Sequence, residues 1–167
     1  MGFYDQEFTG RIEQHSMGHN SRGELFYTVV FVPEHVTKTL PMKEFPRLRV
    51  EGEVAEIPFE GAMQPAKGKK WYLLLSQKFL KQNDLTFGEE VEVRFNIGDQ
   101  DFVDVPAELE AALAANEKAA ELWRTFTPGK KRGFATTVSS AKQTSTREKR
   151  ARKMVGYMLE GKNPGGR

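Results

Sequence analysis

Two stretches of sequence decide the fold: VVFVPEHVTKTLPMKEFPRLRVEGEV, residues 29–54, and YLLLSQKFLKQNDLTFGEEVEVRFNI, residues 72–97. They match in pattern at an offset of 43 residues. Each begins with a continuous apolar run, as a buried strand does, and then meets a residue that starts helices, Pro33 in the first stretch and Ser76 in the second. A short helix and an alternating strand follow in both. The sequence therefore indicates an internal duplication.

The duplication is a match of pattern rather than of identity, and a chance similarity is the alternative. Two pairs are identical, Lys38 with Lys81 and Val50 with Val93, and two pairs break the pattern, Gly52 with Phe95 and Leu40 with Asn83. Two strand–helix–strand units each leave an open sheet edge and an unburied face. Pairing them in one small closed β-barrel removes both problems. Further short strands are expected over residues 6–13 and 56–59.

The chain changes character near residue 104, where strand patterning gives way to Ala, Leu and Glu. Helices are expected within 107–126, with Asn116 capping a second helix there, and a break follows at Pro128. After a poorer helix over 132–141, the last helix is expected to start with a Ser145/Glu148 capping box and to end at Gly161. We therefore expect an α+β protein of three parts: a β-barrel over 1–103, a helical module over 104–162 and a flexible tail over 163–167.

The composition excludes several classes of protein. The 167 residues contain no cysteine, which rules out disulfides, thiolate catalysis and cysteine-based zinc sites. No apolar window is long enough to span a bilayer and no secretory signal is present, so a cytoplasmic protein is expected. His15 and His19 are expected in a glycine-containing loop that does not suit a metal site. No catalytic or phosphate-cradling motif is present, so neither an enzyme nor a cofactor is expected.

Positive charge is concentrated at one end of the chain. Twelve basic and two acidic residues lie between Arg124 and Arg167, a surplus of +10, whereas residues 1–103 carry twelve basic and sixteen acidic residues, a net charge of −4. Such a surplus attracts nucleic acid, anionic membranes or acidic proteins, although a solvated helix face is the simpler alternative. The candidates for anion or nucleic-acid binding are Lys130, Lys131, Arg132, Lys142, Arg147, Lys149, Arg150, Arg152 and Lys153. Phe134 or Tyr157 would supply stacking rings.

Arg147 is the candidate of greatest interest because it lies at the start of the last helix, where the helix dipole disfavours a positive charge. An anion should therefore pair with it. One alternative is a bound phosphate or carboxylate ligand shared with Lys142 and Arg150. The other is an internal ion pair with a glutamate of the preceding helices, for which the sequence offers Glu108, Glu117 and Glu121.

Several motifs resemble known bacterial families. Those in the first half are Phe31-Val32-Pro33, Arg49-Val50-Glu51-Gly52, the strand from Trp71 to Leu75 and Gly88-Glu89-Glu90-Val91, and they resemble a domain of unknown function. Those in the second half are Val105-Pro106, Ala141-Lys142 and Thr146-Arg147-Glu148-Lys149-Arg150, and they resemble a bacteriocin-protection, YdeI/OmpD-associated module, although Val138-Ser139-Ser140 departs from its pattern. The resemblance implies a double-split β-barrel of the AbrB and MazE type, and it brings no catalytic residues.

These observations favour a non-enzymatic binding or adaptor protein, linked by the resemblance to bacterial stress or bacteriocin tolerance. The alternative is a nucleic-acid-binding protein that uses the basic C-terminal helices. A second alternative is a binder of a small anionic ligand at Lys142 and Arg147. The partner is expected to be an acidic protein or a nucleic acid, and the chain is expected to be a monomer or a weak homodimer.

Overall fold

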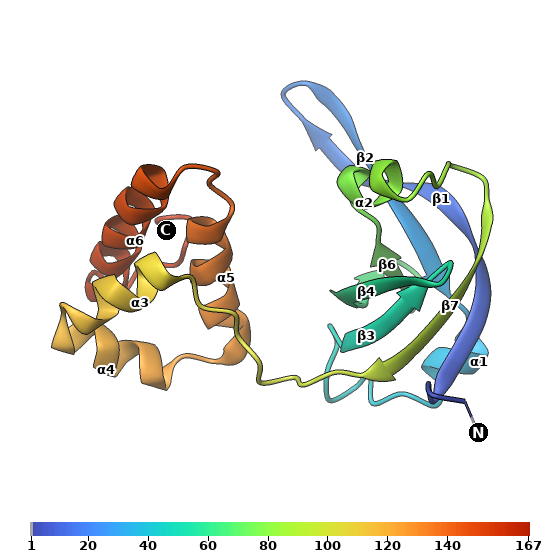
Figure 1. The fold of residues 1–167 in the computed structure, drawn as a ribbon, viewed down its shortest axis with the longest axis horizontal. Coiled ribbons are helices and arrows are strands. Elements are labelled where there is room, and N and C mark those ends of the chain that lie inside the picture. The colour runs from blue at the N-terminus through green and yellow to red at the C-terminus, as the bar shows by residue number, and fades with distance from the viewer. Residues whose placement is uncertain (1) are drawn as a thin grey trace. The chain divides into compact units, whose positions relative to one another are not determined.

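The computed structural model describes residues 2–167 and divides into two compact units, one ending at Gln100 and the other spanning Asp101–Arg167. The first unit is built on strands and the second on helices (Figure 1), which confirms the predicted α+β class. Within the described residues, no helix combines the length and the apolar character needed to cross a bilayer.

The β-rich unit contains one antiparallel sheet of seven strands in the order β4-β3-β7-β1-β2-β6-β5. The strands are β1 (Gln6–Asn20), β2 (Gly23–Val32), β3 (Arg49–Val54), β4 (Ile57–Ala62), β5 (Gln64–Ala66), β6 (Lys70–Leu74) and β7 (Glu90–Ile97). Two short helices, α1 (Glu34–Thr37) and α2 (Gln77–Gln82), follow β2 and β6. The Ser76 hydroxyl caps α2 by accepting a hydrogen bond from the Phe79 N–H at 3.1 Å, as predicted.

Strand β1 is longer than the sequence predicted. It continues past Glu13 and forms a hairpin with β2 that extends beyond the other strands (Figure 1). The loop predicted around His15 and His19 is therefore wrong, because both residues pair with β2. The signal that misled the prediction was Gly18, which adopts a φ of +103° and shifts the register without ending the strand.

The core of the β-rich unit comes from alternate residues of the strands. Ile12, Val30 and Leu73 lie opposite one another on β1, β2 and β6, and all three are fully buried. Val50 and Val93 are likewise buried on β3 and β7, as predicted. Ile97 continues the same alternation along β7, but it is 47% exposed because the strand ends there.

The two predicted copies face each other in a matching register. Val30 pairs with Leu73, the residue 43 positions later, and Gly52 pairs with Phe95, which is also 43 positions later. A two-fold rotation that exchanged the copies would place each of these pairs back on itself. Helices α1 and α2 also begin 43 residues apart.

A close approach of β3 and β7 explains the break in the repeat at Gly52. A Cβ added at Gly52 would lie 2.0 Å from the Arg94 carbonyl oxygen and 2.6 Å from the Phe95 Cα. Only glycine leaves room for the β7 backbone, while the ring of the paired Phe95 fills the core on the same face of the sheet.

The sheet has two edge strands, β4 and β5, which are consecutive in the chain and separated only by the fully buried Met63. Hydrogen bonds do not pair these two strands with each other within residues 2–167. The closed barrel that the sequence predicted therefore stays a prediction.

The helical unit contains α3 (Ala107–Ala114), α4 (Glu117–Thr125), α5 (Pro128–Ser139) and α6 (Thr144–Leu159). Asn116 caps α4 by accepting a hydrogen bond from the Ala119 N–H at 3.0 Å, as predicted. Pro128 does not break the chain as predicted, because Thr127 caps α5 and the proline occupies the first turn, where no N–H donor is needed.

The last helix differs from the prediction at its start and agrees with it at its end. The N-cap is Gln143, so Ser145 lies inside α6 and forms no capping box with Glu148. At the other end, Gly161 has a φ of +71° and the Lys162 N–H donates to the Tyr157 carbonyl at 2.8 Å, which is the predicted glycine C-cap. Leu159 is 38% exposed, whereas four apolar residues at helical spacing before it are buried: Ala151, Met154, Val155 and Met158.

Candidate functional site

Arg147 is held by the protein itself. Its Nε donates to Glu108 Oε1 at 2.8 Å, and its Nη2 donates to Thr144 Oγ1 at 2.9 Å. Its Nη1 donates to the carbonyl oxygens of Ala141 and Lys142, at 3.2 and 2.9 Å. The sequence left open whether Arg147 pairs with a bound anionic ligand or with an internal glutamate, and in the structure its partner is Glu108. The arginine joins the start of α3 to the turn between α5 and α6.

The Arg147–Glu108 pair is largely shielded from solvent, with 25% and 14% of the two side chains exposed. The hydrogen bond from Arg147 lowers the pKa of the Glu108 carboxyl below its usual value of 4.5, and a backbone N–H adds to the effect. Glu108 lies in the first turn of α3, where the helix dipole also favours a negative charge. The pair therefore serves the fold of the helical unit.

Two further candidate arginines bind backbone oxygen atoms. Arg150 donates to the Thr137 carbonyl at 3.0 Å and to the Ser140 hydroxyl at 2.9 Å, and so satisfies the end of α5. Arg132 donates to the Phe102 carbonyl at 2.9 Å. These side chains are committed to holding segments of the helical unit together.

The predicted stacking rings are used differently from the prediction. Phe134 is fully buried and stacks on Phe126 at 5.7 Å, so it is not accessible to a base. Lys130 lies over the Phe126 ring at 4.0 Å, and Lys153 lies over the half-buried Tyr157 ring at 5.6 Å. These lysines contact rings of their own unit.

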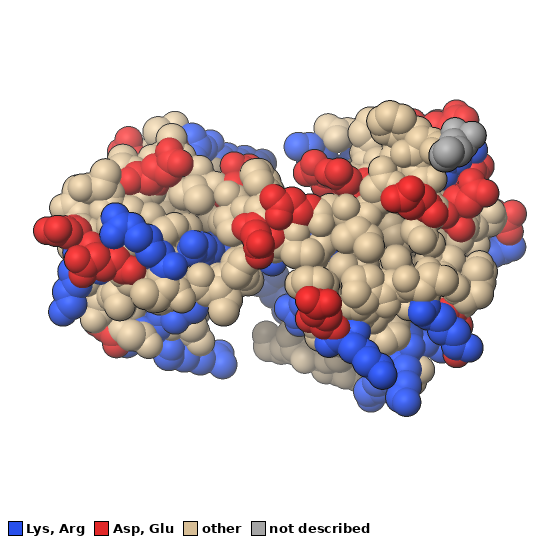
Figure 2. All heavy atoms as spheres, turned by 90° about the horizontal axis from the view of Figure 1, so that it is seen from below, with Lys and Arg blue, Asp and Glu red and all other residues tan. Residues whose placement is uncertain are grey.

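Lys131 also lies over a ring, that of Trp123, at 5.8 Å. The remaining candidates, Lys142, Lys149 and Arg152, are exposed, and their side chains form no hydrogen bond or ion pair within residues 2–167. On the face shown in Figure 2, basic and acidic side chains are interspersed over the helical unit, on the left, rather than gathered into one basic surface.

The outward side of β1, β2 and β6 carries rings instead of the polar side chains that usually face solvent. The His15 ring lies 5.3 Å from those of Phe31 and Tyr72, and the last two are 6.1 Å apart. Tyr72 is only 3% exposed, whereas Tyr27 and Leu74 are each 42% exposed. We call these five residues the aromatic face.

The outward side of β1, β7 and β3 is different, because it carries charges. Arg94 on β7 lies 3.5 Å from a carboxylate oxygen of Glu53 and 3.9 Å from one of Glu7, and it also binds Glu92. Hydrogen bonding to Glu92 raises the pKa of Arg94 further above its usual value. The outward surface of the sheet is therefore aromatic over β1, β2 and β6 and charged over β1, β7 and β3.

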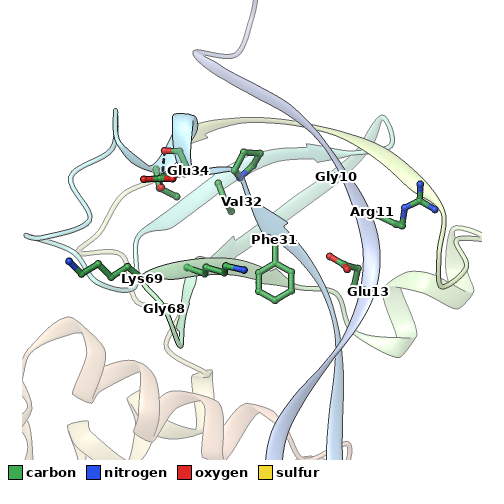
Figure 3. A pocket seen from close by; sticks show the side chains of 11 residues that line it. Gly10, Arg11, Glu13, Phe31, Val32, Glu34, Gly68 and Lys69 are labelled. Atoms are coloured by element: carbon green, nitrogen blue, oxygen red, sulfur yellow. Dashed lines mark hydrogen bonds between the residues drawn. The ribbon is translucent and has the colours of Figure 1, made fainter.

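A groove of about 640 Å³ opens beside the aromatic face. Figure 3 shows the Phe31 ring standing in it, with the Glu13 carboxylate on one side and the Gly68–Lys69 turn on the other. A second hollow of about 470 Å³ adjoins it, since both are lined by Glu34, Thr37 and Lys69.

Sequence reasoning missed both the aromatic face and the groove. Phe31 and Tyr72 lie in continuous apolar runs, which read as buried on both sides. The available signal was the basic turn Lys67-Gly68-Lys69-Lys70, which stands directly before Trp71 in a half whose net charge is negative.

Comparison with known families gives a match for each unit. The family model described as "Domain of unknown function (DUF1905)" matches residues 8–95, more than half of the chain. The model described as "Bacteriocin-protection, YdeI or OmpD-Associated" matches residues 103–161. No curated protein matches the chain. Both family resemblances that the sequence motifs indicated are confirmed.

Proposed function

Because the chain belongs to the DUF1905 family and carries a bacteriocin-protection, YdeI/OmpD-associated module, we propose that it is a non-enzymatic binding or adaptor protein of the cytoplasm that contributes to bacteriocin tolerance. The observation that carries the proposal is the aromatic face. Apolar side chains exposed together on one side of a sheet are a feature of interaction surfaces. Tyr27 and Leu74 have no structural need for their exposure, since the core lies on the other side of the sheet.

We also propose that the β-rich unit is a closed, internally duplicated barrel of the double-split, AbrB-like type. The register of the Val30–Leu73 and Gly52–Phe95 pairs supports a two-fold relation between the copies. In this arrangement β4, Met63 and β5 act as one bent strand in the second copy, as the continuous β1 does in the first. That strand would pair with β3 at one end and β6 at the other, and closure would leave no edge.

The function is tested by survival of bacteria exposed to a bacteriocin. Cells that express the double variant Tyr27→Ser/Leu74→Ser should survive no better than cells without the protein, whereas wild-type expression should raise survival. The variant should stay folded with a melting temperature close to that of the wild type, because neither side chain belongs to the core and surface substitutions usually change stability little. Phe87→Ser is the matched control, since Phe87 is 64% exposed but does not belong to the aromatic face.

Protection by the Tyr27/Leu74 variant equal to that of the wild type, at equal protein level, would remove the aromatic face from the function. Loss of protection by Phe87→Ser as well would mean that exposed rings matter only for solubility or folding, and the proposal would fail.

Nucleic-acid binding by the C-terminal helices is the second candidate function. The observation that favours it is that Lys142, Lys149 and Arg152 are exposed and uncommitted in a segment with a surplus of +10. Fluorescence anisotropy with labelled DNA tests it: Lys149→Gln/Arg152→Gln should weaken binding and lower its salt dependence. The small anionic ligand is disfavoured, because Glu108 occupies the side of Arg147 where that ligand would bind.

A further inference from the structure

The groove beside the aromatic face concentrates positive charge in the half of the chain that is acidic overall. Five basic side chains line the two adjoining hollows: Arg11, Lys38, Lys43, Lys69 and Lys70. Two acidic side chains, Glu13 and Glu34, leave a surplus of three positive charges there. Residues 1–103 have a net charge of −4, so the two hollows together have the opposite sign to that part of the chain.

Three of these lysines are available to a ligand. Arg11 donates to the Gly88 carbonyl at 3.2 Å, and Lys38 pairs with Glu34 at 3.1 Å. The side chains of Lys43, Lys69 and Lys70 form no hydrogen bond or ion pair within residues 2–167. Figure 3 shows the Lys69 side chain extending away from the fold at the end of the groove opposite to Arg11.

Each of the two hollows also offers a ring. Phe31 stands in the first, and Trp71 lines the second. The Trp71 indole is fixed, because its Nε1 donates to the Pro46 carbonyl at 3.1 Å. Rings held beside lysines are the arrangement by which proteins bind unpaired bases together with their phosphates.

We infer that the two adjoining hollows together bind single-stranded nucleic acid, with bases stacked on Phe31 and Trp71 and phosphates at Lys43, Lys69 and Lys70. The inference rests on the binding function proposed above and names the ligand class of the same surface. The Glu13 carboxylate beside Phe31 is placed to accept a hydrogen bond from the amino group of a base, as carboxylates do from cytosine. A duplex does not fit this chemistry, because its bases are already stacked and paired.

The test is fluorescence anisotropy of the full chain with a labelled single-stranded dC 12-mer. Three phosphate contacts give a salt slope of about −2, so binding should weaken about twentyfold between 50 and 200 mM salt. Lys69→Gln/Lys70→Gln should bind at least about tenfold more weakly and bring the slope to about −0.7. Phe31→Leu keeps an apolar side chain but loses the ring, and should weaken binding about tenfold.

Lys78→Gln/Lys81→Gln is the matched control, because it removes the same charge from exposed positions of α2 that line neither hollow, and it should change affinity by less than about twofold. In a Trp123→Phe background, the oligonucleotide should quench the fluorescence of the remaining Trp71 as a base stacks on it. Unchanged fluorescence in the presence of bound oligonucleotide would overturn the inference. A larger loss of affinity in Lys149→Gln/Arg152→Gln than in Lys69→Gln/Lys70→Gln would also overturn it, because binding would then lie on α6.

Three other results would also overturn it: no binding at 50 mM salt, equal affinity for a 12-base-pair duplex, and competition by cytidine monophosphate at the concentration of the oligonucleotide. The last would identify a small-molecule site. Failure of this inference can be told apart from failure of the proposed function, because the bacteriocin survival test of Tyr27→Ser/Leu74→Ser does not depend on nucleic acid.

Discussion

Replacement of Gly52 by alanine is expected to destabilise the β-rich unit strongly. The new Cβ would lie 2.0 Å from the Arg94 carbonyl oxygen, 2.6 Å from the Phe95 Cα and 2.9 Å from the Arg94 carbonyl carbon. All three atoms belong to backbone, so no side chain can turn away. Strands β3 and β7 would have to separate by about 1 Å at a spacing normally near 4.8 Å, at the centre of their pairing. We expect a loss of at least about 3 kcal/mol in the free energy of unfolding.

The assay is thermal unfolding followed by the fluorescence of Trp71 in a Trp123→Phe background, which reports on the β-rich unit alone. A loss of about 3 kcal/mol corresponds to a fall of about 12 °C or more in the melting temperature of a unit of this size. Gly98→Ala is the control, because its Cβ would meet the Arg49 carbonyl oxygen at an ordinary 3.5 Å. A Gly52→Ala melting temperature close to that of Gly98→Ala would refute the strand geometry on which the two-fold relation rests.

Three further predictions concern the helical unit, whose unfolding Trp123 reports. Arg147→Met should lower the free energy of unfolding by about 2 kcal/mol, because the carbonyls of Ala141 and Lys142 lose their donor; denaturant titration measures it. Arg147 lowers the folded-state pKa of the Glu108 carboxyl. The stabilisation that the ionised carboxylate gives the fold is therefore complete above the usual pKa of 4.5 and is lost as pH falls through the folded value. Glu108→Gln should therefore flatten the acid side of the stability–pH curve. Asn116→Ala should cost about 1 kcal/mol in a urea titration, through loss of the α4 cap.

Local patterns in the sequence located most elements correctly. The cap residues Ser76 and Asn116 and the C-cap Gly161 act as predicted, because each depends on neighbours within a few residues. Pro128 and Ser145 were misread, since both residue types are also common inside a first helical turn, and only the flanking backbone shows which residue is the cap. The repeat at an offset of 43 residues was visible because both copies keep one periodicity.

The sites were less predictable than the elements. The sequence located positive charge at the C-terminal end, but Arg147 and Arg150 turn out to bind glutamate and backbone oxygens of their own unit. A count of charges does not show which cations already have partners, because those partners lie up to 39 residues away in the chain.

The sequence by itself determined the α+β class, the duplicated pattern of the first half and the family of each unit, because periodicity and motifs are properties of neighbouring residues. Only the tertiary structure decided that Phe31, Trp71 and three lysines line two adjoining hollows, and that one outward side of the sheet is aromatic while the other is charged. A strand that reads as a continuous apolar run gives no indication of which side faces solvent. That choice depends on the pairing of β1, β2 and β6, which joins residues far apart in the sequence.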